Sequence, residues 1–414
     1  MPGARAPNLD LKSSALNLHD LNLLQHYILH TSKNFSLNSR KSFIWERIIP
    51  EIAAKNVFLM HLLLAVSGLN LLTAQTPDKR TSLTLDSTEL RTLVEHHQKG
   101  LQGLQERLAS IEETNAEVLF AGSMLIVAFA FGSLRAQNLE FLAQPSQNTS
   151  PRDYTFPGHS SSFGKPHIQW LRLVRGVSSI ARHSWKALKI SRLRPLLLFS
   201  NSNEDWRLLG PGPLPTSVSP GCARSEKLSL FATGATRAIL GLRIFWRTLK
   251  VARLDTDSLA PSPTSSTSPD INGDPERDEF FTSQEQAISV VEQMYQRIIY
   301  VLQLERIEPC SSTRDIQAEL EDAAITSWPH LLPETFVSSL DSEGSPDIPT
   351  GLSFIILAHL YLLLTLLHEL WYLGENFAVE IRKIHKLVAD LGDPELFSLM
   401  EWPMNVVNSK SDGS

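Results

Sequence analysis

Apolar residues recur along this chain with the spacing of helices. Over residues 90–111 they follow the i, i+3, i+4, i+7 pattern that places them on one helical stripe. Asp86 and Glu89 form a capping-box pattern that is typical of a helix start. The chain shows no sustained two-residue alternation, so the pattern predicts an all-α fold, built as a single large irregular helical domain with disordered insertions. Further helices are predicted at 18–30, 58–72, 116–134, 284–304, 353–373 and 377–391.

Residues 170–194 have the pattern of a basic amphipathic helix that ends at or before Pro195. One face is apolar and carries Trp170, Val174, Val177, Ala181, Trp185 and Leu188. The adjacent face is basic and carries Arg172, Arg175, Arg182, Lys186 and Lys189. Such a face suits nucleic acid, anionic lipid or an acidic partner helix. Alternatively, the tryptophans face the core and the arginines meet acidic side chains of the same chain.

Three apolar stretches, 56–77, 118–134 and 348–368, contain no Asp, Glu, Lys or Arg and are nearly long enough to span a membrane. They nevertheless contain His61, Asn70, His359 and His368, which find partners in a protein core and are costly when they face lipid. We therefore expect helices buried inside a water-soluble bundle, with no membrane insertion.

Proline and composition indicate the domain limits. Proline is absent from 78–144 and 350–393, where long helices are permitted. The Ser/Pro-rich acidic composition around 259–279 is typical of a disordered linker. We expect a disordered N-terminus at 1–16, a first helical part at 17–254, a linker at 255–280, a second helical part at 281–407 and a disordered tail at 408–414. Loop-rich insertions are expected near 138–166 and 199–226.

Charge is distributed unevenly along the 414 residues. Residues 165–253 hold 16 basic and 3 acidic side chains, whereas residues 255–414 hold 8 basic and 27 acidic ones. This asymmetry indicates either a basic face for an anionic partner or a basic segment that docks on the acidic half of its own chain. The two cysteines, Cys222 and Cys310, are too few for a disulfide framework or a cysteine metal cluster.

Candidate catalytic chemistry is sparse. His26 and His30 share a helical face, but the glutamate of a zinc-peptidase helix is replaced by Tyr27. The neighbours His96 and His97 point about 100° apart on a helix, which suits one core and one surface residue. The pair Glu321 and Asp322 has polar neighbours and is interpreted as a solvated face, as is the pair Glu112 and Glu113. We therefore predict no catalytic site, no metal and no cofactor, and a protein that is not an enzyme.

A ligand pocket, if present, is expected where polar groups interrupt the apolar helices. The polar candidates are His61, Ser67, Asn70, Ser123, His359 and Tyr361, with Met60, Met124, Phe354 and Trp371 as walls. Side chains of these kinds at such positions are more often plain core filling.

Several stretches in fixed order resemble one family. They are LHDLNLLQHY at 18–27, FLMHLLLAVSGL at 58–69, WLRLVRGVSSI at 170–180, AHLYL at 358–362 and EWP at 401–403. Together they resemble the regulatory domain of fungal zinc-cluster transcription factors of the sterol uptake control type, over roughly 17–403. The segment 196–260 has no counterpart in this resemblance, and the glycine-rich stretch of sterol-sensing members is reduced here to WYLGENF at 371–377.

The resemblance implies an all-helical effector domain around a hydrophobic interior, which in sterol-sensing members binds a sterol. Family members also carry an N-terminal six-cysteine zinc cluster that binds DNA. Here only 17 residues, none of them a cysteine, precede the first matching stretch, so no direct DNA binding by this chain is expected. We expect a nuclear transcription regulator of a metabolic or secondary-metabolite gene set that acts through a DNA-bound partner, a homodimer or an apolar effector. The alternative is a cytoplasmic or membrane-surface binding protein for an apolar ligand such as a sterol.

Overall fold

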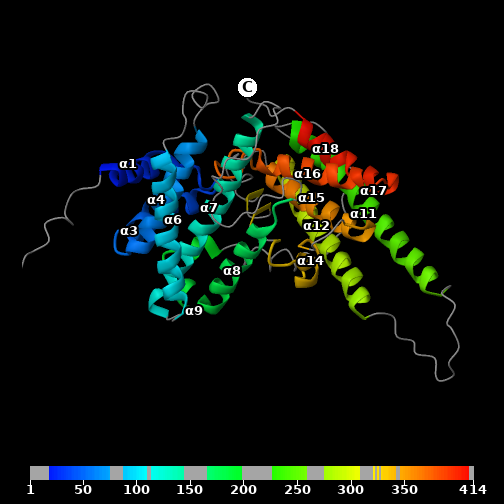
Figure 1. Ribbon diagram of the computed structural model, residues 1–414, viewed down its shortest axis with the longest axis horizontal. Coiled ribbons are helices and arrows are strands. Elements are labelled where there is room, and N and C mark those ends of the chain that lie inside the picture. Colours follow the sequence, from blue (N-terminus) through cyan, green and yellow to red (C-terminus); the bar gives the residue numbers. More distant parts are fainter. Residues whose placement is uncertain are drawn as a thin grey trace, which may run out of the picture.

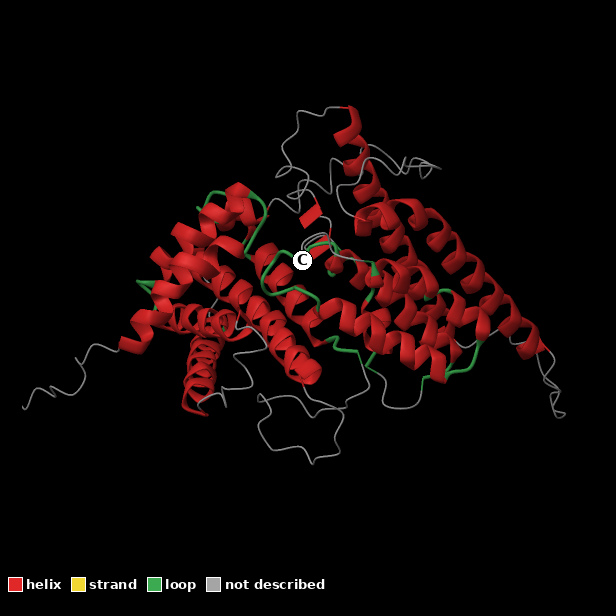
Figure 2. Ribbon diagram, turned by 90° about the horizontal axis from the view of Figure 1, so that it is seen from above, coloured by secondary structure: helices red, strands yellow, loops and turns green. Residues whose placement is uncertain are grey.

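The computed structural model describes residues 18–74, 87–109, 113–143, 166–197, 226–258, 275–307, 320–321, 324–325, 328–341 and 346–409. Within these ranges every regular element is helical, which confirms the predicted all-α class. Figure 2 shows the helices packed around one another with short connections between many of them.

The longer helices are α1 (Leu18–His26), α4 (Val57–Ala74), α6 (Ser87–Leu108), α7 (Ala116–Ala143), α8 (Gln169–His183), α11 (Glu226–Ser258), α12 (Pro275–Ile307), α15 (Ile348–Thr365), α16 (Asn376–Asp390) and α18 (Glu401–Asn408). The shorter ones are α2 (Ser39–Phe43), α3 (Ile49–Ala53), α9 (Trp185–Leu188), α14 (Glu334–Ser339) and α17 (Pro394–Ser398). Two single-turn π-helical segments, Tyr27–Thr31 and Ile44–Ile48, extend α1 and connect α2 to α3.

The helices form two groups that meet along α7 and α8 (Figure 1). The first group holds α1 to α9, and the second holds α11 to α18. Helix α7 of the first group contacts α16 of the second. At this junction the Asn376 Nδ2 atom donates a hydrogen bond to the Phe131 carbonyl at 3.2 Å. A single hydrophobic core runs through both groups.

Helix α15 is the centre of the second group. Apart from Ile348 and Thr350, all of its residues are buried. The helix begins with Asp347, whose side chain accepts the Thr350 backbone N–H, and has a proline in its first turn, where the lost backbone donor costs nothing. Helices α11, α12, α14, α16, α17 and α18 all contact it. An uncharged helix of this length is stable in water only when it is covered in this way.

In the first group, α6 lies against both α4 and α7. Gly103 of α6 permits the close approach to α4, because a Cβ atom built there would be only 2.4 Å from Cβ of Phe58. The other faces of α4 are also packed into the core, where its side chains Leu59, Leu63 and Val66 are fully buried.

Several predicted boundaries need correction. The predicted helix at 353–373 starts earlier, at Ile348, and ends at Thr365, after which the chain turns through Gly374 with a positive φ of 48°. The helix predicted at 170–194 is broken at Ser184, ends at Leu188 and is followed by a 3-10 turn, Arg194–Leu197, that contains Pro195. The break leaves the apolar face directed at the core.

The segment that had no counterpart in the family resemblance contains the 33-residue helix α11. This helix runs to Ser258, and α12 starts at Pro275, so both edges of the predicted linker 255–280 are helical. Helix α7 likewise continues to Ala143, beyond the predicted start of an insertion at 138. The predicted disorder at 1–16, the interior of the linker, most of both insertions and the last five residues lie outside the described residues.

Four helices have the length and apolar composition of a membrane span: α4, α7 through Leu139, α11 through Ala252, and α15. In the folded chain 61%, 72% and 89% of the apolar windows of α4, α7 and α15 are buried, but only 28% of that of α11. The three apolar stretches found in the sequence are therefore covered by protein, whereas α11 is covered on one side and exposed on the other.

The approach of α6 to α4 gives a stability prediction. We expect Gly103→Ala to lower the free energy of unfolding by about 1–3 kcal/mol, because the added methyl group must displace Phe58. Urea denaturation followed by circular dichroism measures this loss. Gly176→Ala is the matched control, since its Cβ meets nothing within 4 Å in the middle of α8, and it should stabilise the protein slightly. Equal effects of the two substitutions would contradict the close approach.

Candidate functional site

Six of the ten predicted pocket residues lie in three groups, on α4, on α15 and at Trp371, each with its own neighbours. The first group is where α4 meets α1. Ser67 Oγ donates a hydrogen bond to the Leu23 carbonyl at 2.6 Å. The Asn70 side-chain oxygen accepts from Thr31 Oγ1 at 3.1 Å and lies 2.9 Å from His26 Nε2. These polar groups of α4 hold α1 and the turn after it in place.

His61 belongs to a chain of three titratable groups. Its Nδ1 lies 2.8 Å from Nδ1 of His96, and Nε2 of His96 lies 3.2 Å from the Asp20 carboxylate. Because the carboxylate only accepts, His96 donates through Nε2, and a neutral His96 then accepts from His61 at Nδ1. Burial lowers the pKa of both histidines, and Asp20 opposes that effect at His96. The chain of contacts joins α1, α4 and α6.

The expectation that His96 and His97 divide between core and surface is wrong. His96 is buried toward α1 and α4, and His97 stacks on Phe129 of α7 with ring centroids 3.9 Å apart. Both side chains turn inward because α6 has neighbours on two sides. Burial lowers the pKa of His97 to about 4.

The second group is on α15. The Tyr295 hydroxyl of α12 lies 3.1 Å from His359 Nδ1 and donates to the His359 carbonyl at 2.9 Å. The His359 ring also stacks on Trp402 of α18, and burial lowers its pKa to about 4. The Tyr361 hydroxyl donates to the His167 carbonyl at 2.7 Å and accepts a hydrogen bond from Trp170 Nε1 at 3.3 Å. These contacts attach α12, α18 and α8 to the central helix.

The third group surrounds Trp371, in the turn after α15. Its ring lies edge-on to Phe35 with centroids 5.9 Å apart, and its carbonyl accepts a hydrogen bond from Arg135 of α7. A Cβ atom at Gly132 of α7 would lie 3.0 Å from the Trp371 ring, so the indole rests directly on the helix backbone. Trp371 Nε1 and Ser133 Oγ are buried and have no hydrogen-bond partner among the described residues. Buried polar atoms in this state call for an explanation.

The other candidates occupy ordinary core positions. Ser123 Oγ donates to the Phe120 carbonyl of its own helix at 2.8 Å. Met60 and Met124 are partly buried against the core, and Phe354 is buried. The ten candidates therefore do not surround one common point, and a ligand role for any of them stays a prediction.

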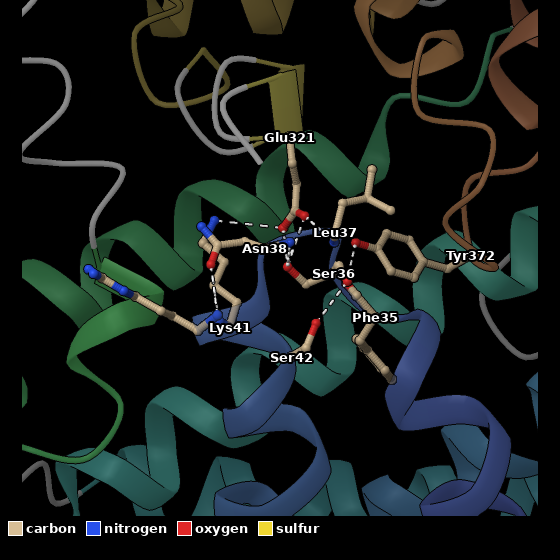
Figure 3. A network of polar contacts seen from close by, with 9 residues as sticks. Phe35, Ser36, Leu37, Asn38, Lys41, Ser42, Glu321 and Tyr372 are labelled. Carbon is tan, nitrogen blue, oxygen red and sulfur yellow. Dashed lines mark hydrogen bonds and ion pairs between the residues drawn. The ribbon is translucent and has the colours of Figure 1, made fainter. Parts of the chain in front are cut away.

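The most densely connected polar site was missed by the sequence analysis. Glu321, interpreted there as part of a solvated face, is buried, and both of its carboxylate oxygens lie 2.8 Å from Ser36 Oγ (Figure 3). One of them also accepts the Leu37 N–H at 2.6 Å. The buried Lys41 ammonium lies 3.7 Å from the carboxylate. Asp322, the carboxylate next to Glu321 in the sequence, lies outside the described residues.

The same site includes the segment between the first two helices and Tyr372, whose hydroxyl donates to the Phe35 carbonyl at 3.2 Å (Figure 3). It thus joins residues 35–41 to residues 321 and 372, which are far apart in the sequence. No pattern near Glu321 predicts this burial, because its partners come from the opposite end of the chain.

Some residues of the predicted basic face form ion pairs, and the others are exposed to solvent. Arg172 pairs with Asp341, and Arg175 lies 2.7 Å from Glu334 and donates to the Leu332 carbonyl at 3.1 Å. Arg182, Lys186 and Lys189 are exposed. The apolar side faces the core, with Trp170 fully buried and Trp185 packed partly against it.

Further basic residues of 165–253 also meet the acidic half of the chain. Arg243 pairs with Glu292, and the buried Lys227 ammonium lies 3.9 Å from Glu375. Ion pairs within the chain thus account for part of the charge asymmetry.

Metal binding gains no geometric support within the described ranges, which contain no group of three or more His, Cys, Asp or Glu side chains placed to hold an ion. The rings of His26 and His30 lie near each other with centroids 5.0 Å apart, but the imidazole of His26 is occupied by Asn70. Cys222 and Cys310 lie outside the described residues.

Comparison with known proteins gives the family context. Residues 22–183 match the model of the fungal specific transcription factor domain. The chain is 26% identical over 182 residues to sterol uptake control protein 2 of Candida albicans and 26% identical over 192 residues to sterol uptake control protein 2 of Saccharomyces cerevisiae. These alignments cover 43% and 46% of this chain, but only 21% and 18% of the two relatives.

The family match confirms the predicted resemblance over residues 22–183, and the two relatives support the same class, transcription regulation. The matched domain, 22–183, includes α4, α6, α7 and α8. It therefore holds the first polar group and the N-terminal side of the Glu321 site.

The Glu321 site yields a prediction about stability. Glu321→Gln should lower the free energy of unfolding by about 3 kcal/mol, because it leaves the Lys41 charge buried without its counter-charge. Adding Lys41→Met should recover part of that loss, as a double-mutant cycle in urea would show. Glu51→Gln is the control, since Glu51 pairs with Lys55 and Arg192 at the exposed surface and should give no measurable change. An unchanged midpoint for Glu321→Gln would contradict the burial of this pair.

A second prediction concerns pH. His97 is neutral in the fold, because its pKa is lowered to about 4, whereas the unfolded chain takes up a proton near pH 6.5. Unfolding therefore binds a proton between pH 6.5 and pH 4, and stability falls as the pH falls through that range, by about 2 kcal/mol at pH 5.

Urea midpoints measured at pH 7, 6 and 5 test this dependence. His97→Phe keeps the stacking on Phe129 and should make the decline shallower, while the buried His359, whose pKa is also about 4, retains its own share. The assignment fails if the substitution leaves the pH dependence unchanged.

Proposed function

We propose that this chain is the effector part of a nuclear fungal transcription regulator that controls a metabolic or secondary-metabolite gene set. The observation that carries the proposal is the match of residues 22–183 to the fungal specific transcription factor domain. The sterol uptake control proteins of two yeasts, which the chain resembles over less than half its length, support the same class. A DNA-bound partner protein provides the link to the promoter, and the chain binds that partner as a monomer or as a homodimer.

The second part of the proposal is that the region around Trp371 responds to an apolar effector. Trp371 Nε1 is buried there and lacks a partner among the described residues. Ser133 Oγ is also buried without a partner, on α7 next to Gly132, on which the indole rests. A ligand with one hydroxyl or carbonyl oxygen on an apolar body, such as a sterol, supplies the missing acceptor.

Position strengthens this choice over the other polar groups. Trp371 contacts Phe35, next to the Glu321 site, and is hydrogen-bonded through its carbonyl to α7. A ligand that prefers one packing of this junction over another shifts the relation between the two helix groups, which is the requirement for a switch.

The alternative function is a carrier that holds the same apolar ligand in the cytoplasm or at a membrane surface. The open basic side chains of the α8–α9 region, Arg182, Lys186 and Lys189, favour a membrane-surface role. Transcription is therefore the property that separates the two functions.

A reporter experiment tests the proposal. The full chain is fused to a heterologous DNA-binding module in yeast, and we expect reporter transcription to differ at least threefold from that of the module alone. Reporter activity equal to the module alone would overturn the regulatory function and favour the carrier.

The effector site is tested in the same assay with sterol synthesis inhibited or normal. Trp371→Phe removes the indole N–H but keeps an aromatic ring, and we expect it to reduce the response to sterol depletion severalfold. Trp185→Phe, on α9, is the matched control and should respond like the unmodified chain. A normal response of Trp371→Phe would exclude the indole as a ligand contact while leaving the regulatory function standing.

A further inference from the structure

The outer face of α11 carries an unpartnered apolar stripe. Leu240, Ile244 and Val251 are 57%, 55% and 56% exposed, although the opposite face of the same helix packs into the core through Phe231, Leu242 and Trp246. Single exposed apolar side chains are ordinary, but three on one stripe of one helix are not. Figure 1 shows α11 at the edge of the molecule, with α12 on its inner side.

The stripe has the spacing of a helix-pairing seam. Positions 233, 237, 240, 244, 247 and 251 follow alternating steps of four and three residues, which is the a/d pattern of a coiled coil. Thr233, Arg237 and Arg247 complete it, and all three are exposed. Neither arginine forms an ion pair with any of the described residues, in contrast to Arg243 on the flank, which pairs with Glu292.

The two arginines determine what kind of helix fits. If two copies of the chain paired antiparallel through this seam, Leu240 would face Ile244 of the partner subunit, and Arg237 would face Arg247 of the partner subunit. A parallel pair would set each arginine against its own equivalent. Like charges directly opposed across an interface disfavour both arrangements, so a second copy is the wrong partner.

We propose that the Arg237–Val251 stripe of α11 binds an acidic amphipathic helix of another protein. The partner helix places apolar side chains against Leu240, Ile244 and Val251 and carboxylates against Arg237 and Arg247, ten residues or about 15 Å apart. The proposal does not depend on the function proposed above, since a carrier equally needs a docking partner.

A synthetic helical peptide tests the fit directly. Its seam carries Leu, Glu, Leu, Leu, Glu and Ala at positions 1, 5, 8, 12, 15 and 19, which oppose positions 251 to 233 in antiparallel order. With the full chain, we expect saturable binding by fluorescence anisotropy that weakens as salt is raised. A peptide with lysine in place of both glutamates should bind at least tenfold more weakly.

Charge exchange identifies the contact. Arg237→Glu combined with Arg247→Glu should abolish binding of the glutamate peptide and create binding of the lysine peptide. Leu240→Asp should weaken the glutamate peptide at least tenfold, with unchanged circular dichroism because the side chain is exposed. Ile190→Asp is the control, since Ile190 is 83% exposed elsewhere and should leave binding unaltered.

Other occupants give distinct results, each of which would overturn the proposal. A dimer in analytical ultracentrifugation that Leu240→Asp dissociates would identify a second copy. Flotation with phosphatidylcholine–phosphatidylglycerol vesicles, lost in Leu240→Asp and without peptide binding, would identify a membrane. Peptide binding that appears only after the acidic residues of 255–279 are replaced by amides would identify the chain's own segment. If no form of the chain binds the glutamate peptide, the proposed binding of an acidic helix to α11 is also rejected.

Discussion

The fold is organised by the need to cover uncharged helices. Helix α15 carries no charged side chain and is buried on all sides, and α4 is also uncharged over its whole length. Burial of such helices provides the main stabilisation, but it brings polar atoms into the core, where an unpaired hydroxyl, amide or imidazole costs about 1–3 kcal/mol. The surrounding helices must therefore supply both apolar contacts and hydrogen-bond partners.

The polar groups of the apolar helices consequently serve mostly as hydrogen-bonding partners that link neighbouring helices. Gln284 of α12 donates to the Pro349 carbonyl and to Ser353 at the start of α15, Tyr295 reaches His359, and Tyr361 reaches the segment before α8. In the first group, Asn70 does the same for the turn after α1. Because each of these hydrogen bonds requires one partner at one position, together they specify a particular helix packing more strongly than hydrophobic contacts do.

Much of the architecture was predictable from the sequence, because it rests on local periodicity. The class, the long helices α4, α6, α7 and α16, and the inward side of Trp170 follow from the spacing of apolar residues. Helix α11 was not predicted, because its apolar residues lie on two opposite faces and leave no clear amphipathic pattern. The ends of α15 were misplaced because the apolar run continues beyond the turn at Thr365.

The sequence could indicate which residue types form the candidate sites, but not which residues lie together in space. The expectation that polar residues inside apolar helices are special identified His359 and Tyr361, and Trp371 was predicted as a pocket wall, but the pattern could not show that their partners differ. Glu321 escaped because the burial of a carboxylate depends on Ser36 and Lys41, more than 270 residues away. Such long-range pairs leave no trace in a local pattern.

That separation has a consequence for how the chain matures on the ribosome. Ser36, Leu37 and Lys41 emerge early, but the carboxylate that they surround follows only after about 280 further residues, which at cellular elongation rates takes about 15–60 s. During that interval the growing first half holds an unneutralised ammonium and unpaired donors at the place where its counterpart will dock. The nascent protein thus cannot complete this polar site until translation has passed residue 321.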